Sequence, residues 1–257
     1  MKNIDIVILA AGAGTRMQSE RPKVLLETNG KPLINHLLDT LTSLSFSRPP
    51  VIVVGYKADE VKGALGTRYT YVHQNERKGT AHAVAQAKDI LRGRSETVIT
   101  FFGDTPFISA DSIRTLIESQ QHDDVAFSMG VSIVPHFEDH YKGLHDFGRI
   151  IRDTDGSILQ NIEKKNFTPE IASLKEVNPG FYCFNADWLW DNIDSITPTL
   201  PANEYYLPSL IDIAHAQNMK IRGVVVSPEE CLGANTREHL VEIESLLSTK
   251  QRAKVSV

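Results

Sequence analysis

The sequence is poor in cysteine and lacks any long hydrophobic run, and both absences narrow the class of protein. Only two cysteines occur among its 257 residues, Cys183 and Cys231, and neither forms a Cys-x-x-Cys pair or has histidines at zinc-ligand spacing. We interpret them as reduced thiols of a cytoplasmic protein. No segment approaches the roughly 20 apolar residues of a membrane-spanning helix, and we recognise no signal peptide.

A surplus of positive charge is also missing. The chain has 27 Lys and Arg against 32 Asp and Glu, a formal net charge of −5. Non-specific nucleic-acid binding needs a basic face, so we do not expect nucleic acid as a partner. Local cations can still bind a small anion. The length fits one large α/β domain or two small ones.

Two common nucleotide-binding motifs are absent or incomplete. No Gly-x-x-x-x-Gly-Lys-Ser/Thr run occurs, which argues against a P-loop. Gly12 and Gly14 follow an apolar strand at residues 5–9, but Met17 stands where the dinucleotide-binding fingerprint has a small residue. A polar loop with a proline replaces the helix that should begin there. An NAD-dependent oxidoreductase is therefore disfavoured.

The same segment, residues 9–25, nevertheless combines features that suit a polyphosphate. Its two glycines allow a tight turn that presents backbone N–H groups. Arg16 and Lys23 add positive charge, and Thr15 adds a hydroxyl. The alternative is a glycine turn with two solvated cations. The complete spacing, with Thr-Arg-Met and Pro-Lys-Val-Leu, favours a nucleotide site.

Apolar patterns of helix and strand type alternate along the first half of the chain. They predict helices at residues 33–44, 58–65 and 81–91, and strands at 51–54, 69–74 and 97–102. This alternation is typical of an α/β fold, a Rossmann-like, mostly parallel sheet flanked by helices.

The second half is more mixed. The patterns predict strands at 125–134, 177–185 and 221–227, a hairpin of 148–152 and 158–163, and helices at 205–215 and 236–250. We expect one domain over residues 1–235, in which residues 134–225 form a smaller hairpin-rich lobe over the end of the sheet.

Ligands of open α/β sheets bind beyond the carboxyl ends of the strands, so the residues there are the candidates. The third strand leads to Gln74 and then Gly79-Thr80, and the fourth to Gly103-Asp104. Asp104 is a candidate Mg²⁺ ligand, with a helix N-cap or turn residue as the alternative. Gln74 is either a reader of a base edge or a surface amide. Thr80 fits a helix cap as well as a ligand contact, and we interpret His82 as structural.

These residues together resemble the sugar-1-phosphate nucleotidyltransferases. The chain is most similar to the N-terminal uridylyltransferase domains of the bacterial bifunctional N-acetylglucosamine-1-phosphate uridylyltransferase/glucosamine-1-phosphate acetyltransferases. The similarity runs along essentially the whole chain. Beyond the motifs already described, it includes Phe147-Gly148-Arg149-Ile150, Glu163, Asn178, Glu204-Tyr205-Tyr206 and Asn235.

The resemblance implies an enzyme that joins UTP and N-acetylglucosamine 1-phosphate, giving UDP-N-acetylglucosamine and pyrophosphate. The sugar phosphate would attack the α-phosphorus in line, assisted by Mg²⁺. Arg16, Lys23 and Asp104 would be catalytic, and Asp104 and Asn235 would hold the metal. The other implied substrate-binding residues are Leu9, Ala10, Ala11, Gly12, Gly14, Thr15, Gln74, Gly79 and Thr80 on the nucleotide side, Phe102 and Gly103 before Asp104, and Gly148, Glu163 and Asn178 around the sugar.

Several positions depart from the pattern of this family. Arg77 replaces a second glutamine, Phe102 a tyrosine and Pro179 a threonine, and Pro208 lies in an altered run after Glu-Tyr-Tyr. These departures leave open CTP or dTTP as the nucleotide, or another phosphorylated acceptor. A non-catalytic nucleotide-sugar binding protein of the same fold is a separate alternative, and the retained Arg16, Lys23, Asp104 and Asn235 argue against it.

The hexapeptide repeats of a β-helix domain are not found in this chain. Residues 236–257 resemble the linker to such a domain. The chain is either a stand-alone enzyme or part of a longer protein, and we expect a monomer or weak homodimer.

Overall fold

The computed structural model describes residues 3–14, 17 and 19–255, and the side chains of these residues up to position 249. Thr15 and Arg16, both predicted to bind the nucleotide, therefore lie outside the described residues. Within the described part, no helix is long and apolar enough to cross a membrane.

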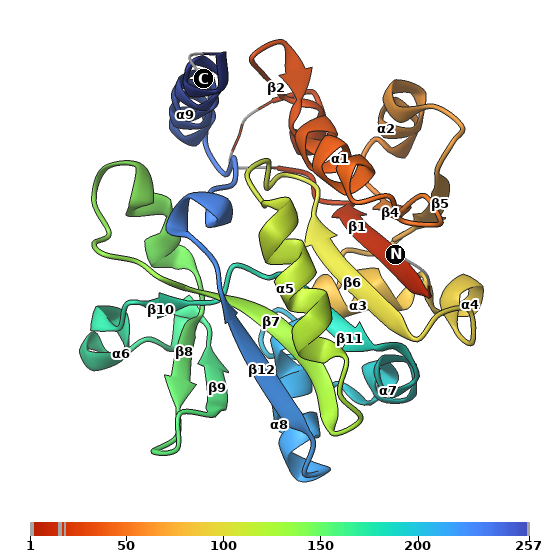
Figure 1. Ribbon diagram of the computed structural model, residues 1–257, viewed down its shortest axis with the longest axis vertical. Coiled ribbons are helices and arrows are strands. Elements are labelled where there is room, and N and C mark those ends of the chain that lie inside the picture. The colour runs from red at the N-terminus through yellow and green to blue at the C-terminus, as the bar shows by residue number, and fades with distance from the viewer. Residues whose placement is uncertain (1–2, 15–16, 18, 256–257) are drawn as a thin grey trace.

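A mixed sheet of 10 strands forms the centre of the molecule (Figure 1). Its order is β5-β4-β1-β6-β11-β7-β10-β8-β9, and β12 pairs with β7. The first four of these are parallel: β1 Ile4–Ala10, β4 Val51–Val54, β5 Thr70–His73 and β6 Thr97–Phe102. Antiparallel pairing begins at β11 (Tyr182–Asn185), which lies between β6 and β7 (Val125–Ile133). The predicted Rossmann-like sheet flanked by helices is confirmed.

The strand order places a topological switch point at β1. The chain goes from β1 to β4 and β5 on one side, and then returns to β6 on the other side of β1. Connections that diverge in this way leave a crevice at the carboxyl ends of the two central strands. The glycine segment follows β1 directly, so the fold puts it at this crevice.

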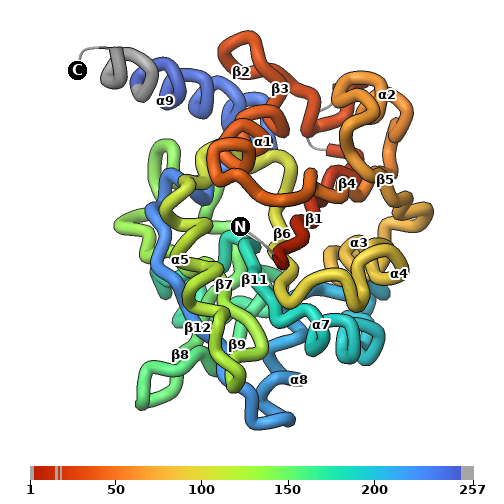
Figure 2. Tube along the Cα trace, turned by 45° about the vertical axis from the view of Figure 1, so that its right-hand side comes forward, coloured from red at the N-terminus to blue at the C-terminus, as the bar shows by residue number. Residues whose placement is uncertain are grey.

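Alternation along β1 divides the core into two layers. Ile4, Ile6 and Ile8 pack on one face with α1 (Leu33–Ser43) and α5 (Ala110–Gln120). Val7 packs on the other face with residues of α3 (Thr80–Ala85), α7 (Ala186–Asn192) and α8 (Leu210–Ala216). Figure 2 shows α1 and α5 on one side of the sheet and α3 and α7 on the other. Successive side chains of a strand point to opposite faces, which is why one apolar run supplies both layers.

The predicted hairpin-rich lobe is only partly separate from the sheet core. β8 (Arg149–Arg152) and β9 (Ile158–Ile162) form the expected hairpin, and β10 (Glu176–Val177) joins β8 to β7. Within the same range of residues, β11 and β12 (Lys220–Val225) pair with β6 and β7.

Three predicted elements are divided or shortened in the structure. The helix predicted at 81–91 is split into α3 and α4 (Lys88–Leu91). The strand predicted at 177–185 is interrupted at Pro179 and Gly180, because Pro179 has no N–H to donate and Gly180 has a φ of +85°. The helix predicted at 205–215 begins only at Leu210, after a 3₁₀ turn at Leu207–Ser209 that holds Pro208.

Helices α5, α6 (Pro169–Ser173) and α7 were not predicted, although local caps mark all three. Ser109, Thr168 and Asn185 each accept a hydrogen bond from a backbone N–H in the first turn. The remaining elements are α2 Ala58–Leu65, the short pair β2 Glu27–Thr28 and β3 Lys31–Pro32, and α9 Arg237–Val255, which contacts β2.

Candidate active site

Two adjoining cavities lie at the carboxyl ends of the central strands. The first, here called the β1 cavity, has a volume of about 490 Å³ and borders the glycine segment. The second, the lobe cavity, has a volume of about 340 Å³ and borders the hairpin side. They share the lining residues Lys23, Thr80, Phe102, Asp104 and Tyr206. This arrangement suits two ligands that meet at a common wall.

The β1 cavity contains most of the predicted nucleotide side of the site, namely Leu9, Ala10, Ala11, Gly12, Gln74, Gly79, Thr80 and Phe102. Gly79 is required by geometry. Its φ is +96°, and a Cβ at this position would lie 2.3 Å from the carbonyl oxygen of Tyr205. The hydroxyl of Thr80 accepts a hydrogen bond from the N–H of Leu207 at 3.0 Å. Thr80 is the first residue of α3 after the cap position Gly79, so its interpretation as a helix cap is wrong.

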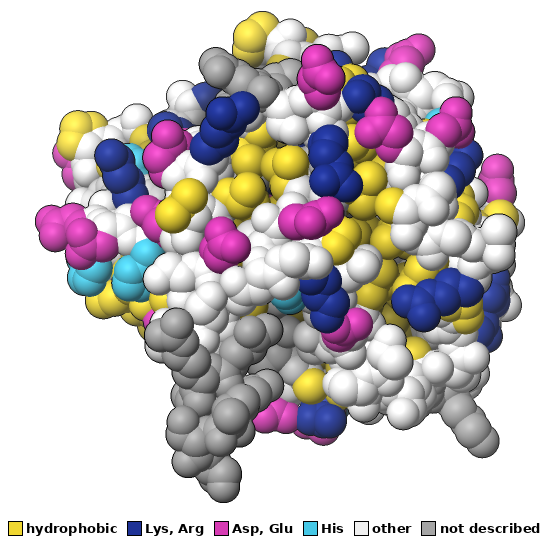
Figure 3. Space-filling model, turned by 90° about the horizontal axis from the view of Figure 1, so that it is seen from above, with side chains coloured by type: hydrophobic (Ala, Val, Ile, Leu, Met, Phe, Trp, Pro, Cys, Tyr) yellow, Lys and Arg dark blue, Asp and Glu magenta, His cyan; other side chains and the backbone are white. Residues whose placement is uncertain are grey.

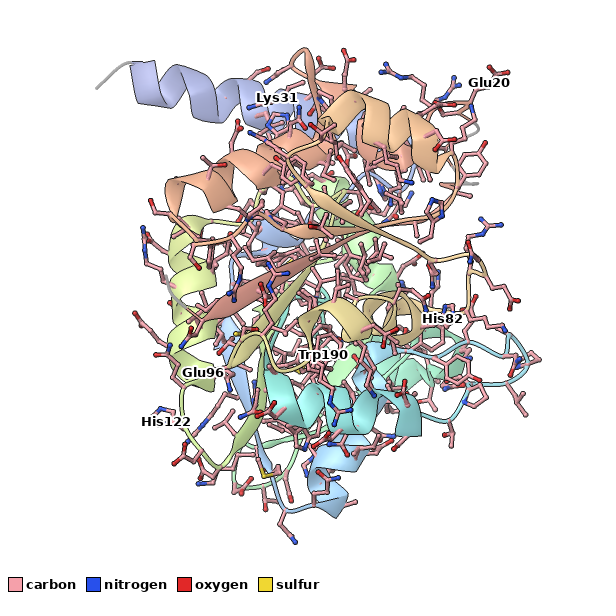
Figure 4. The ribbon with its side chains drawn as sticks, turned by 90° about the vertical axis from the view of Figure 1, so that its right-hand side faces the viewer. Glu20, Lys31, His82, Glu96, His122 and Trp190 are labelled. Atoms are coloured by element: carbon pink, nitrogen blue, oxygen red, sulfur yellow. The ribbon has the colours of Figure 1, made fainter. Side chains whose placement is uncertain are left out.

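The side chain of Gln74 is held rigidly at the wall of this cavity. It is only 5% exposed, so the alternative of a surface amide is wrong. Its Nε2 donates to the carbonyl of Gly79 at 3.0 Å and lies 3.0 Å from Nδ1 of His82. His82 lies on α3, as Figure 4 shows, and orients Gln74, which fits its structural interpretation. In the His82 tautomer whose Nδ1 accepts from Gln74, both amide hydrogens of Gln74 are engaged, and Oε1 remains to meet a ligand.

Lys23, Asp104 and Asn235 meet at the junction of the two cavities. The ammonium of Lys23 forms an ion pair with Asp104 Oδ2 and lies 2.7 Å from Asn235 Oδ1. The Lys23 and Asp104 side chains are 15% and 17% exposed. Asp104 is not a helix N-cap, because α5 begins at Ala110 and is capped by Ser109.

This junction has the chemistry of a hard-cation site. A carboxylate and an amide oxygen converge on one positive charge, which the ammonium supplies. Mg²⁺ takes few protein ligands when phosphate oxygens and water complete its shell, so the donor set fits this ion. Among the described residues no group of three or more His, Cys, Asp and Glu is placed to hold a metal, as a zinc centre would require.

The lobe cavity contains the predicted sugar side of the site. Gly148, Glu163 and Asn178 line it, as does Asn235. Its apolar wall consists of Phe102, Phe147, Pro179, Tyr182 and Pro208. The family departures Phe102, Pro179 and Pro208 therefore all lie in this one cavity.

Asn161 connects these residues, and it was missed at the level of sequence. Its Nδ2 donates to Glu163 Oε1 at 2.7 Å, and its Oδ1 accepts from Asn178 Nδ2 at 3.1 Å. A signal was present, because residues two apart in an extended strand share a face, and Asn161 precedes Glu163 by two. The tertiary contact with Asn178 had no signal in the sequence.

The other predicted site residues are placed less directly. Gly103 is buried and is not among the residues that line the two cavities; its N–H donates to the carbonyl of Leu9 at 2.9 Å. Gly14 leaves space for the Lys23 side chain, since a Cβ at position 14 would lie 2.9 Å from the Cβ of Lys23. The cysteines are free and buried, as expected for reduced thiols.

The face shown in Figure 3 carries Lys and Arg side chains interspersed with Asp and Glu. On the described part of this face, positive charge does not form one continuous patch.

Comparison with known proteins identifies the family of this chain. The model of the family described as "MobA-like NTP transferase domain" matches residues 6–143, more than half of the chain. The chain belongs to the MobA-like NTP transferase family. It is 35% identical to the bifunctional protein GlmU of Solibacter usitatus, covering 98% of this chain and 53% of that protein. It is 37% identical to GlmU of Bacillus licheniformis, covering 96% and 52%.

The chain thus spans about half the length of these curated relatives, and the similarity falls on their N-terminal half. Two solved structures share the fold of this NTP transferase. A CMP:2-keto-3-deoxy-manno-octonic acid synthetase complexed with CTP gives a TM-score of 0.69 at 17% identity, covering 97% of this chain and 100% of that one. A protein described as a glucose-1-phosphate thymidylyltransferase from Bacillus anthracis gives 0.74 at 18% identity, covering 95% and 94%.

Proposed function

We propose that this NTP transferase joins UTP and N-acetylglucosamine 1-phosphate, releasing pyrophosphate and forming UDP-N-acetylglucosamine. The observation that carries the proposal is the Lys23–Asp104–Asn235 junction, which lies where the two cavities meet. A nucleotide in the β1 cavity and a sugar phosphate in the lobe cavity would bring their phosphates together there. The similarity to GlmU proteins supports the same pair of substrates.

The reaction needs position and positive charge more than it needs a base. An oxygen of the sugar phosphate forms a bond to the α-phosphorus, and the bond from that phosphorus to the leaving pyrophosphate breaks. The attacking group is already an anion, so no proton has to be removed from it. The Lys23 ammonium offsets charge that develops on the triphosphate. Asp104 and Asn235 would hold Mg²⁺, which when bound neutralises phosphate charge and orients the oxygens.

The position of Gln74 favours a pyrimidine base that presents a hydrogen-bond donor to the cavity wall. Its free Oε1 can accept from N3–H of uracil, whose two carbonyl oxygens remain for backbone N–H groups nearby. Arg77 supports a second candidate, CTP. It lines the β1 cavity and has no carboxylate at ion-pair distance among the described residues. A guanidinium donates only, which suits the neighbouring acceptors O2 and N3 of cytosine.

Pyrophosphate release with Mg²⁺, measured for UTP, CTP, dTTP and ATP against several sugar 1-phosphates, tests the proposal. We expect the highest kcat/KM for UTP with N-acetylglucosamine 1-phosphate. A clear preference for CTP or dTTP would replace the nucleotide assignment. Binding of UDP-N-acetylglucosamine without turnover would favour a nucleotide-sugar binding protein instead.

Asp104→Ala should abolish turnover in a folded protein, and Asp111→Ala is the matched control. Asp111 lies in the first turn of α5, exposed and away from both cavities. Light scattering tests the proposed monomer or weak homodimer.

A further inference from the structure

Asn161 lies where three residues of the lobe cavity come together. Its amide contacts both Glu163 and Asn178, as described above. It also fills the space beside Gly148, because a Cβ on Gly148 would lie 2.4 Å from Asn161 Oδ1. The carbonyl of Gly148 accepts the backbone N–H of Asn178 at 2.9 Å. A single side chain thus lies against all three residues that are predicted to hold the sugar.

The orientation of the Asn161 amide follows from its partners. The carboxylate of Glu163 only accepts hydrogen bonds, so the NH₂ end of Asn161 must face it. The carbonyl end then faces the NH₂ group of Asn178. An apolar side chain at this position would leave both groups without these partners.

The side-chain amide of Asn178 is in turn hydrogen-bonded within the protein. Its NH₂ group donates to Asn161 Oδ1 at 3.1 Å and to the Tyr182 hydroxyl at 2.7 Å, and its Oδ1 accepts from Gly180 N–H at 2.9 Å. Both amide hydrogens are used, so Asn178 can only accept from a ligand. The carboxylate of Glu163 is likewise only an acceptor. Asn161 donates to Oε1 of Glu163, so Oε2 of Glu163 remains for the ligand.

We propose that Asn161 is the positioning residue of the acceptor site, and that it sets a preference for acceptors that donate hydrogen bonds. It holds Glu163 and Asn178 so that both present oxygen acceptors to the lobe cavity. A sugar 1-phosphate with neighbouring hydroxyl or N–H donors meets this arrangement. The inference rests on the proposed function, because it assumes that the lobe cavity takes the acceptor.

The first experiment uses Asn161→Asp, with Gln160→Glu as the matched control. Gln160 is the preceding residue in β9 and is exposed, and its substitution changes the same amide to an acid. In Asn161→Asp a carboxylate replaces the donor to Glu163. At pH 8 we expect the KM for the acceptor to rise about tenfold or more, with kcat and the KM for UTP within about twofold.

The same variant should recover as the pH falls toward 6. Two carboxylates in contact share a proton more readily than either alone, and that proton restores the hydrogen bond. A residue with only a structural role would not give this pH-dependent rescue. Other charged or titratable groups around Asn161 and Glu163 are Asp146, Lys164, Lys165, Tyr182, Tyr206 and Asp212, and the Gln160→Glu control corrects for their titration.

A second experiment measures the contact between Gly148 and Asn161 by urea unfolding, without substrate. Gly148→Ala should lower the urea midpoint of unfolding because of its clash with the Asn161 amide. In the Asn161→Ala background this loss of urea midpoint should fall to about half or less, as expected for residues in contact.

Monodeoxy analogues of the acceptor test the proposed specificity. The kcat/KM of the wild type should be at least tenfold lower for one or more analogues than for the acceptor itself, and Asn161→Ala should show a smaller difference.

The results distinguish a failure of the Asn161 inference from a failure of the proposed function. An acceptor KM in Asn161→Asp equal to that of Gln160→Glu, or independent Gly148 and Asn161 effects, overturns the inference. Absence of turnover in the wild type, with calorimetric binding of N-acetylglucosamine 1-phosphate intact, overturns the proposed function alone, and the Asn161 effect is then read from Kd. Absence of both binding and turnover for every sugar phosphate overturns both.

Discussion

The junction of Lys23, Asp104 and Asn235 makes a quantitative prediction about metal affinity. The Lys23 ammonium contacts the two oxygens that would hold Mg²⁺, one from Asp104 and one from Asn235. A metal ion must therefore displace the ammonium before it can bind. Lys23→Met removes this competitor, so the variant should bind Mn²⁺, used as a probe for Mg²⁺, more tightly than the wild type in the absence of nucleotide.

The size of the effect follows from the burial of the pair. Exposed ion pairs contribute about 0.2–1 kcal/mol, and breaking a fully buried one costs about 3–5 kcal/mol. The Lys23 and Asp104 side chains are 15% and 17% exposed and lie between these limits. About 1–3 kcal/mol is then the intermediate range, and at 1.4 kcal/mol per tenfold it predicts a gain in Mn²⁺ affinity of roughly 5- to 150-fold.

Titration of the nucleotide-free protein with MnCl₂, followed by electron paramagnetic resonance, measures this gain. Lys88→Met is the matched control, because Lys88 also forms an ion pair, with Asp194 at 2.5 Å, and neither residue is close in sequence to Lys23, Asp104 or Asn235. Turnover of Lys23→Met should fall by much more than its affinity for UTP, since the ammonium acts on charge that develops in the transition state. Unchanged or weaker Mn²⁺ binding in Lys23→Met would refute this account of the junction.

Three further predictions concern residues that support the site or the stability of the fold. Gly79→Ala should destabilise the protein by about 1–3 kcal/mol in urea unfolding and raise the KM for UTP, because its Cβ would meet the backbone of Tyr205 at a φ of +96°. Arg149→Leu should cost about 2–4 kcal/mol and raise the acceptor KM, because the fully buried guanidinium donates to three backbone carbonyls and lies over two phenylalanine rings; unchanged unfolding would contradict that role. Burial lowers the pKa of His36 below its usual 6.5, so its contribution to stability is complete above pH 6.5 and is lost as the pH falls through the lowered pKa. Replacing His36 with Gln should flatten this part of the profile of unfolding free energy against pH, and an unaltered slope would assign it to other groups.

Local patterns were sufficient to predict much of the framework. The apolar run of β1, the glycines after it and the alternation of strands and helices predicted the parallel half of the sheet and the crevice at its carboxyl ends. Those signals are local, because hydrophobic periodicity and turn chemistry act over a few residues. Helix α5 was not among the predicted helices, although it also carries such local signals. Its cap Ser109 and its buried Ile113, Leu116 and Ile117 are local signals of the same kind, at the spacing of one helix face.

The relations between distant residues required the tertiary structure. The ammonium of Lys23 meets Asn235, 212 positions away, only because the sheet brings both segments to one end of β1 and β6. The amide of Gln74 loses its donor capacity to Gly79 and His82, and that of Asn178 to Asn161 and Tyr182.

The sequence by itself therefore determined which groups are available at the site, namely the glycine turn, the cations, the carboxylates and the amides. Only the tertiary structure decided which of their hydrogen-bonding atoms remain free for a ligand. The physical reason is that an amide or ammonium has a fixed number of hydrogens, and the partners that engage them come from remote segments of the chain.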